Sequence, residues 1–288
     1  VVLTLSGGLY DSGFSNERFS TLSVTGDDVT IRNLTIEPST LSSNSTAIIG
    51  FNNRFRGDAT NSLTVEDVTF RAQKGARRGI YMPSSQDTSF TVRRVTLEGL
   101  GTGLTLQGSS VVVEDVVATN TALTLNALGT RFIKVRRLTH QDGEDCVRAT
   151  LRPEGGEDSV FEELDCKVVD TALRVTVQTP SDATPRALLI RDNTLASRYA
   201  LSMRLDDPNM EATVNANTIR TTSTWGGEVI FEAPMRFVMT NNVFLNHRSY
   251  ALNLFQVDQA ADILMAHNSF RSWMSGTAHL RLFLQAPD

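Results

Sequence analysis

The segments "VTIRNLTI" (29–36), "LTVEDVTF" (63–70) and "FTVRRVTL" (90–97) share one pattern of apolar and polar residues. Seven further segments follow it, at intervals of 21 to 34 residues with a mean of 26. The third residues of the ten segments, which we call the anchor positions, are Ile31, Val65, Val92, Val113, Val135, Phe161, Ile190, Val214, Met239 and Met265. A repeat of this period is typical of a solenoid, and the alternation within each unit predicts β-strands.

A second strand-like stretch follows most anchor segments, as in "GLTLQ" (103–107), "CVRAT" (146–150) and "ALNLF" (251–255). No sustained helical period occurs, which excludes a solenoid of helices. Two or three short parallel strands per coil form a parallel β-helix. The sequence therefore predicts an all-β fold, a β-solenoid of about ten coils, as a single domain over residues 1–288. We expect this domain to be a fragment of a larger chain.

Columns of the repeat identify the core. The anchor position and the position five residues later are almost all apolar, so both are expected to point inward. His140 and Cys166 interrupt the second of these columns. We interpret His140 as a buried, hydrogen-bonded core residue, because that is more common for such a histidine than a ligand role. Cys146 and Cys166 fall on different sides of neighbouring coils, which predicts two free thiols.

Two polar columns predict how the coils are held in register. Three residues after the anchor, the last four coils carry Asn193, Asn217, Asn242 and Asn268. We predict that they form an interior asparagine ladder, with left-handed backbone angles at these positions. Immediately after the anchor, the first seven coils read Arg32, Glu66, Arg93, Glu114, Arg136, Glu162 and Arg191. Opposite charges on adjacent strands stabilise their pairing, so we predict an outer charge ladder here.

Composition excludes some classes of protein. The chain of 288 residues is 40% apolar and 20% charged, which is typical of a globular protein. Its net charge of −5 and the lack of a lysine–arginine run argue against a nucleic-acid partner or an anionic membrane surface. No apolar stretch approaches the roughly 20 residues of a membrane span. We therefore expect no nucleic-acid binding and no membrane insertion, while the oligomeric state is left open.

Over nearly its whole length the repeat resembles the single-stranded right-handed parallel β-helix of the pectin lyase-like superfamily. The resemblance implies one of several functions: polysaccharide lyase, polygalacturonase-like hydrolase, pectin methylesterase, epimerase, or non-catalytic surface protein. "GEDCVRA" (143–149) is similar to the acidic turn of polygalacturonases, which would make Glu144 and Asp145 the general acid and base. The other motifs of that family are absent here. "SSQDTSF" (84–90) is similar to a pectin methylesterase motif, but the turn equivalent to that family's catalytic aspartate has no acid.

The second strands supply the remaining candidate site. Arg148 and Arg174 occupy the same column of adjacent coils, and Arg204 lies two positions further along in the next coil. Stacked arginines are costly unless an anion joins them, and a guanidinium suits a carboxylate well. Asp145, Asp206 and Asp207 lie near them, where bound Ca²⁺ would favour an enzyme, and Arg204, Asp206 and Asp207 are candidate substrate-binding residues. In the alternative, the arginines pair internally with Asp145, Asp170 and the acidic loops.

Three aromatic residues, Tyr199, Trp225 and Tyr250, are predicted near the same turn of successive coils. They would suit a sugar-stacking platform, or would stack on one another within the solenoid.

Two functional hypotheses remain. Under the first, the chain is a non-catalytic extracellular or cell-surface module, of a bacterium, that is structural and binds acidic polysaccharide along the Arg148–Arg174–Arg204 face. Under the second, it is a polysaccharide lyase or glycoside hydrolase acting on uronate-containing polymers, with Asp145, Arg148 and Arg174 as catalytic residues. A lyase would use an arginine to abstract the C5 proton, with Ca²⁺ lowering the relevant pKa values.

Overall fold

The structure, a computed structural model, describes eleven stretches of the chain. They are residues 2–3, 19–24, 28–36, 45–51, 62–72, 78–82, 87–221, 225–248, 250–256, 261–272 and 279–284. Statements below concern these residues only.

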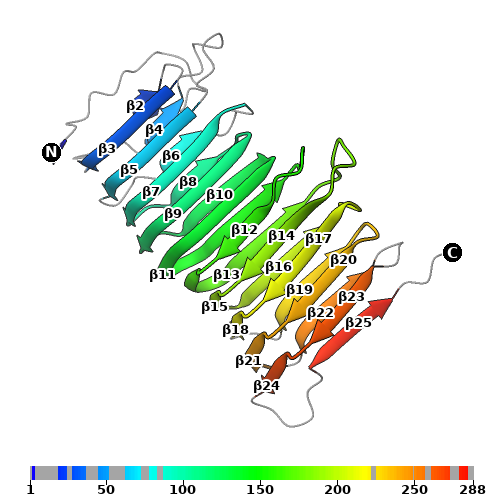
Figure 1. Cartoon of the computed structure of the whole chain (residues 1–288). Coiled ribbons are helices and arrows are strands. Elements are labelled where there is room, and N and C mark those ends of the chain that lie inside the picture. Colours follow the sequence, from blue (N-terminus) through cyan, green and yellow to red (C-terminus); the bar gives the residue numbers. More distant parts are fainter. Residues whose placement is uncertain are drawn as a thin grey trace.

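The described chain is all-β and has no helix. Its strands pair in parallel, each with the equivalent strand of the next coil, and form a parallel β-solenoid of about eight turns with partly described coils at its two ends. Figure 1 shows the strands lying side by side in chain order from the N-terminus to the C-terminus. The predicted fold class is therefore confirmed.

Strands of each coil belong to three stacks, which follow one another along the chain. The first stack carries the anchor positions and contains β3 (Asp28–Ile36), β5 (Ser62–Arg71), β7 (Ser89–Glu98), β9 (Ser110–Thr119), β11 (Phe132–Leu151), β12 (Ser159–Glu162), β14 (Arg186–Arg191), β17 (Met210–Asn215), β20 (Arg236–Thr240) and β23 (Asp262–Ala266). The second stack is short and contains β1 (Val2–Leu3), the later residues of β3, β5, β7 and β9, the middle of β11, the start of β13 (Asp165–Val177), β15 (Thr194–Ser197), β18 (Thr218–Thr221), β21 (Val243–His247) and β24 (Ser269–Ser272). The third stack contains β2 (Phe19–Val24), β4 (Ser45–Phe51), β6 (Arg78–Met82), β8 (Thr102–Leu106), β10 (Leu123–Thr130), the ends of β11 and β13, β16 (Tyr199–Leu205), β19 (Trp225–Phe231), β22 (Tyr250–Gln256) and β25 (Leu280–Leu284).

The interior is a continuous apolar column built from the predicted inward positions. In β5 the burial alternates along the strand, with Leu63, Val65, Val68 and Phe70 buried. Each of these side chains lies directly over the equivalent residue of β7, so like packs on like through successive coils. Burial of apolar surface at roughly 25 cal/mol per Å² makes this column the main source of stability.

A sharp bend joins the first and second stacks at the same place in every coil. The residue two positions after the anchor has a positive φ, between 50° and 58°, in all ten coils: Asn33, Asp67, Arg94, Asp115, Arg137, Glu163, Asp192, Ala216, Asn241 and His267. Left-handed backbone angles cost about 1–2 kcal/mol for a residue with a side chain. The stacking of coils therefore imposes this conformation even on arginine, glutamate and alanine.

The outer charge ladder is confirmed between Arg93 and Arg191. Arg93 Nε lies 2.9 Å from Glu114 Oε2, and Glu162 pairs with both Arg136 and Arg191.

The next column, at the bend itself, is paired in the same way. Arg94 Nε lies 2.7 Å from Asp67 Oδ1, and Arg94 also contacts Glu66. Arg137 Nε lies 2.6 Å from Asp115 Oδ1, one coil further along. The hydrogen bond from Arg137 holds the pKa of the Asp115 carboxyl below its usual range. Because these groups are largely exposed, each pair contributes modestly, and the repetition matters more than any single pair.

The asparagine ladder is confirmed in the last four coils, but the predicted left-handed angles belong to the preceding residue. Asn217 Nδ2 donates to Asn242 Oδ1 at 2.9 Å and to the Ile190 carbonyl at 3.0 Å. Its Oδ1 accepts from the backbone N–H of Asn193 at 3.0 Å and from Asn193 Nδ2 at 2.8 Å. The asparagine side chains thus form hydrogen bonds with backbone groups at the bend. They occupy the position that carries leucine or valine in the first six coils.

Replacing Asn217 with Ala is expected to lower the free energy of unfolding by roughly 3 kcal/mol, because buried partners on both neighbouring coils lose their hydrogen bonds. Denaturant unfolding of the variant measures the loss. Asn215→Ala is the matched control, since Asn215 bonds Thr240 and Asn241 at the surface of the same coil. Equal losses in the two variants would contradict a special role for the interior ladder.

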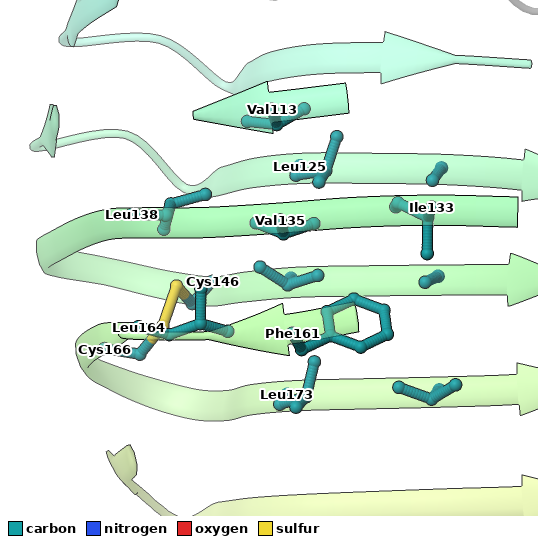
Figure 2. Close-up of a cluster of buried hydrophobic side chains, with 14 of the residues drawn as sticks. Val113, Leu125, Ile133, Val135, Leu138, Cys146, Phe161, Leu164, Cys166 and Leu173 are labelled. Carbon is teal, nitrogen blue, oxygen red and sulfur yellow. A yellow bond between two sulfur atoms is a disulfide. The ribbon is translucent and has the colours of Figure 1, made fainter. Parts of the chain in front are cut away.

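The prediction of two free thiols is wrong. Cys146 and Cys166 form a disulfide with a Cα–Cα distance of 6.0 Å, and both are fully buried. Figure 2 shows this bond inside the solenoid, beside Leu164. The two residues do come from different stacks of adjacent coils, but the interior is narrow at the bend between these stacks. Side chains that point inward from two walls therefore meet there.

Loss of this disulfide is expected to lower the free energy of unfolding by about 3 kcal/mol, because it closes a loop across a sequence separation of 20 residues. The double variant Cys146→Ala with Cys166→Ala, compared with the unaltered protein by denaturant unfolding, measures the loss. Titration of the unfolded, unreduced protein for free thiols should detect none. A full complement of two reactive thiols would contradict the bond.

Candidate functional site

Two columns of residues run along the third stack, on either side of a bend. Asp145, Cys146 and Val147 are all buried, so the normal alternation of buried and exposed residues is interrupted there. The first column, the acid–aromatic column, contains Asp145, Thr171 and Tyr199 in register, and further along Trp225 in register with Tyr250. The second, the arginine column, contains Asn126, Arg148, Arg174, Ser202 and Glu228. The structure thus places Arg148 and Arg174 in direct register on one face, with Tyr199 on the strand next to Arg174.

The stretch "HQDGEDCVRAT" (140–150) is the part of β11 that leads from the second stack into the third. His140 is fully buried and its Nε2 donates to the Thr121 carbonyl at 2.7 Å, which confirms its prediction as a core residue. A side chain at Gly143 would collide with His140 Nε2 and with the same carbonyl oxygen, so only glycine fits over the ring. Glu144 is exposed. Val147 and Ala149 point inward as predicted, with Arg148 between them facing outward.

Asp145 and Arg148 form an ion pair. Arg148 Nη2 lies 2.5 Å from Asp145 Oδ2, and the Asp145 side chain is only 6% exposed while that of Arg148 is 41% exposed. The carboxylate is therefore enclosed by the protein, and the guanidinium carries the exposed part of the pair. A group held in this way is poorly placed to act on a bound molecule from solution, because its accessible surface is small.

Arg174 lies one coil beyond Arg148, in direct register with it. Its Nη2 donates a long hydrogen bond of 3.4 Å to Thr171 Oγ1. Within the described residues it has no carboxylate partner, whereas Arg148, Arg204 and Arg191 each have one. Arg174 is therefore a guanidinium on this face whose charge is not matched by any acid of the described residues.

A pocket of about 230 Å³ opens beside Arg174. It is lined by Arg174, Tyr199, Leu201, Ser202, Gly226, Gly227 and Glu228. The Tyr199 ring is held from one direction by Arg198, whose guanidinium carbon lies 5.1 Å from the ring centroid. The pocket thus combines a guanidinium, a carboxylate, a hydroxyl and an aromatic ring, which are the groups that recognise sugars and anions.

Arg204, Asp206 and Asp207 lie away from the pocket and are occupied elsewhere. Arg204 Nε lies 2.6 Å from Glu232 Oε2, in an outward column two residues further along the strand. Asp206 accepts a hydrogen bond of 2.5 Å from Thr179 Oγ1.

Asp207 is fully buried beneath the neighbouring loops, with Oδ2 3.2 Å from Arg186 Nε. Burial raises the pKa of its carboxyl. Arg186 also forms an ion pair with Asp182, which lies four residues before it in the turn that precedes β14. These three side chains fasten the long turns 178–185 and 206–209 to one another, so Asp207 has a structural place in the fold.

The three predicted aromatic residues begin successive strands of the third stack: Tyr199 begins β16, Trp225 begins β19 and Tyr250 begins β22. The backbone of Trp225 pairs with that of Tyr250. The Trp225 side chain lies outside the described part of the structure. Arg281 lies over the Tyr250 ring, with its guanidinium carbon 5.0 Å from the centroid.

Sequence reasoning missed Ser202, Glu228 and the Gly226–Gly227 pair, which line the pocket with Arg174. Their register was readable in principle, because Ser202 and Glu228 follow Arg174 in the same column of the next two coils. The partner Arg186 was harder to find, since it begins β14 while Asp207 lies in the turn after β16, and the length of the intervening turns decides their contact.

Within the described residues, no group of three or more His, Cys, Asp or Glu side chains is placed to hold a metal ion. The same residues include no helix long and apolar enough to cross a membrane. Comparisons with protein-family models, with curated proteins and with solved structures find no match for this chain.

The buried His140 predicts a pH dependence of stability. Burial lowers the pKa of its imidazole below the usual value of 6.5. As pH falls from about 7 to about 5, the unfolded chain takes up a proton more readily than the folded one, so stability is lost over this range. We expect His140→Gln, whose amide also donates a hydrogen bond, to show a smaller loss in denaturant unfolding. Parallel pH profiles for the two proteins would contradict this assignment.

Proposed function

We propose that this protein is a non-catalytic β-solenoid module, exported to the cell surface or beyond it, that binds acidic polysaccharide at the Arg174 pocket. One observation carries the proposal: Arg174 faces the pocket without a carboxylate partner among the described residues, while Arg148, in register with it, is paired with Asp145. An unmatched guanidinium beside an aromatic ring and a hydroxyl suits the carboxylate of a uronate sugar.

The disulfide supports the proposed location. Disulfides persist in oxidising environments, outside the cytoplasm, and are rare in reducing ones. The bond between Cys146 and Cys166 is buried in the core, where it is a structural element of the solenoid.

The enclosure of Asp145 supports the non-catalytic part of the proposal. An acid–base mechanism on a glycosidic bond needs two carboxyls that reach the bond, roughly 6.5–9.5 Å apart in an inverting hydrolase. Asp145 is buried and paired with Arg148, and Asp207 is buried beneath loops. We also propose that the solenoid is the right-handed β-helix of the pectin lyase-like superfamily, on the grounds of its repeat and its asparagine ladder. A crystal structure would establish the hand.

Arg174→Gln is expected to weaken binding of polygalacturonate by about tenfold or more, because a hydrogen bond to a charged group contributes about 1.5–3 kcal/mol. Isothermal titration calorimetry, with and without calcium, measures the change. Arg191→Gln is the matched control, since Arg191 is paired with Glu162 on the first stack. The same samples are followed for the ultraviolet absorbance of unsaturated uronide products.

Equal binding by Arg174→Gln and the unaltered protein would contradict the site. Growth of the ultraviolet absorbance would contradict the non-catalytic proposal and favour a lyase.

A further inference from the structure

The Arg174 pocket contains an unmatched charge of each sign. Glu228 lies in the arginine column two coils beyond Arg174, with Ser202 between them. Like Arg174, Glu228 has no ion pair within the described part of the chain, although both line the same pocket. Two other outward acids on or directly after strands are paired, Glu232 with Arg204 and Glu162 with Arg136 and Arg191.

The two groups lie on strands two coils apart and do not form an ion pair with each other in the described residues. Adjacent coils lie about 4.8 Å apart, so the backbones that carry Arg174 and Glu228 are separated by about 10 Å along the solenoid axis. Ser202 is too short to close this gap, and Gly226 and Gly227 bring backbone without side chains to the pocket. The result is a pocket with a positive end and a negative end along the solenoid axis.

We infer that this pocket recognises a zwitterionic saccharide, in which a uronate carboxylate binds Arg174 and the ammonium group of a neighbouring amino sugar binds Glu228. This inference rests on the proposed function and specifies its ligand. Charge complementarity at both ends gives selectivity, since a ligand without the cationic group leaves the Glu228 carboxylate desolvated and unpaired. Tyr199 supplies an aromatic surface for a sugar ring, and Ser202 a hydroxyl between the two charges.

A saccharide fits these features better than a peptide of mixed charge. The charged residues lie in one straight column on a regular parallel sheet, with a fixed repeat between coils. An extended polymer with regularly repeated units can follow such a column, whereas a peptide strand would seek backbone hydrogen bonds, and these strands are already paired on both sides.

The test uses two polymers that differ at one group only. An alternating glucuronate–glucosamine polymer with free amines is compared with its N-acetylated form by isothermal titration calorimetry. We expect the unaltered protein to bind the free-amine polymer at least about tenfold more tightly, as a charge-assisted pair of about 1.5 kcal/mol implies. Glu228→Gln should remove this preference, so that the ratio of the two dissociation constants collapses. Glu211→Gln, an acid paired with Arg236 on the first stack, controls for the change in net charge and should keep the preference.

Failure to distinguish the two polymers, or a preference that survives in Glu228→Gln, overturns the inference. Binding of polygalacturonate that still depends on Arg174 would then leave the proposed function standing. Loss of that dependence would overturn both.

Discussion

Parallel pairing between coils places every side chain about 4.8 Å from the equivalent side chains of the two neighbouring coils. Each position along a coil therefore becomes a column, and a column is stable only if its members tolerate one another. Valine on valine, asparagine on asparagine and arginine on glutamate are three solutions to the same constraint. The bend after the anchor shows how strong the constraint is, because arginine and glutamate adopt left-handed angles there.

Column rules also explain what could be predicted from the sequence. The anchor segments gave the strands, their pairing, the core and both ladders, because each depends on residues at fixed offsets within one repeat. His140 was placed correctly for the same reason, as a member of an inward column. The disulfide was not predicted, since it joins two columns across the interior and depends on the width of the coil at that bend.

Candidate site residues on strands were predicted better than those in turns. Arg148, Arg174 and Tyr199 lie on strands, and register brought them together on one face as expected. Asp206 and Asp207 follow a strand end, where turns of unequal length decide their partners, and they are bound to Thr179 and Arg186. Pairing of Asp145 with Arg148 follows from their position across a bend, which strand alternation alone does not reveal.

The interior position three residues after the anchor changes from leucine or valine to asparagine along the solenoid. This change affects how such a molecule can gain coils. Coils of the first part carry Leu or Val three residues after the anchor, and coils of the last part carry an asparagine whose amide needs an asparagine beside it. Duplication of a coil next to its parent preserves these contacts. Transfer of an early coil into the later part sets an apolar side chain against an amide with no substitute partner. Growth by copying a coil beside its parent keeps every column intact. The change from Leu164 to Asn193, where the Leu164 N–H donates to the Asn193 side chain, marks the border between the two kinds of coil.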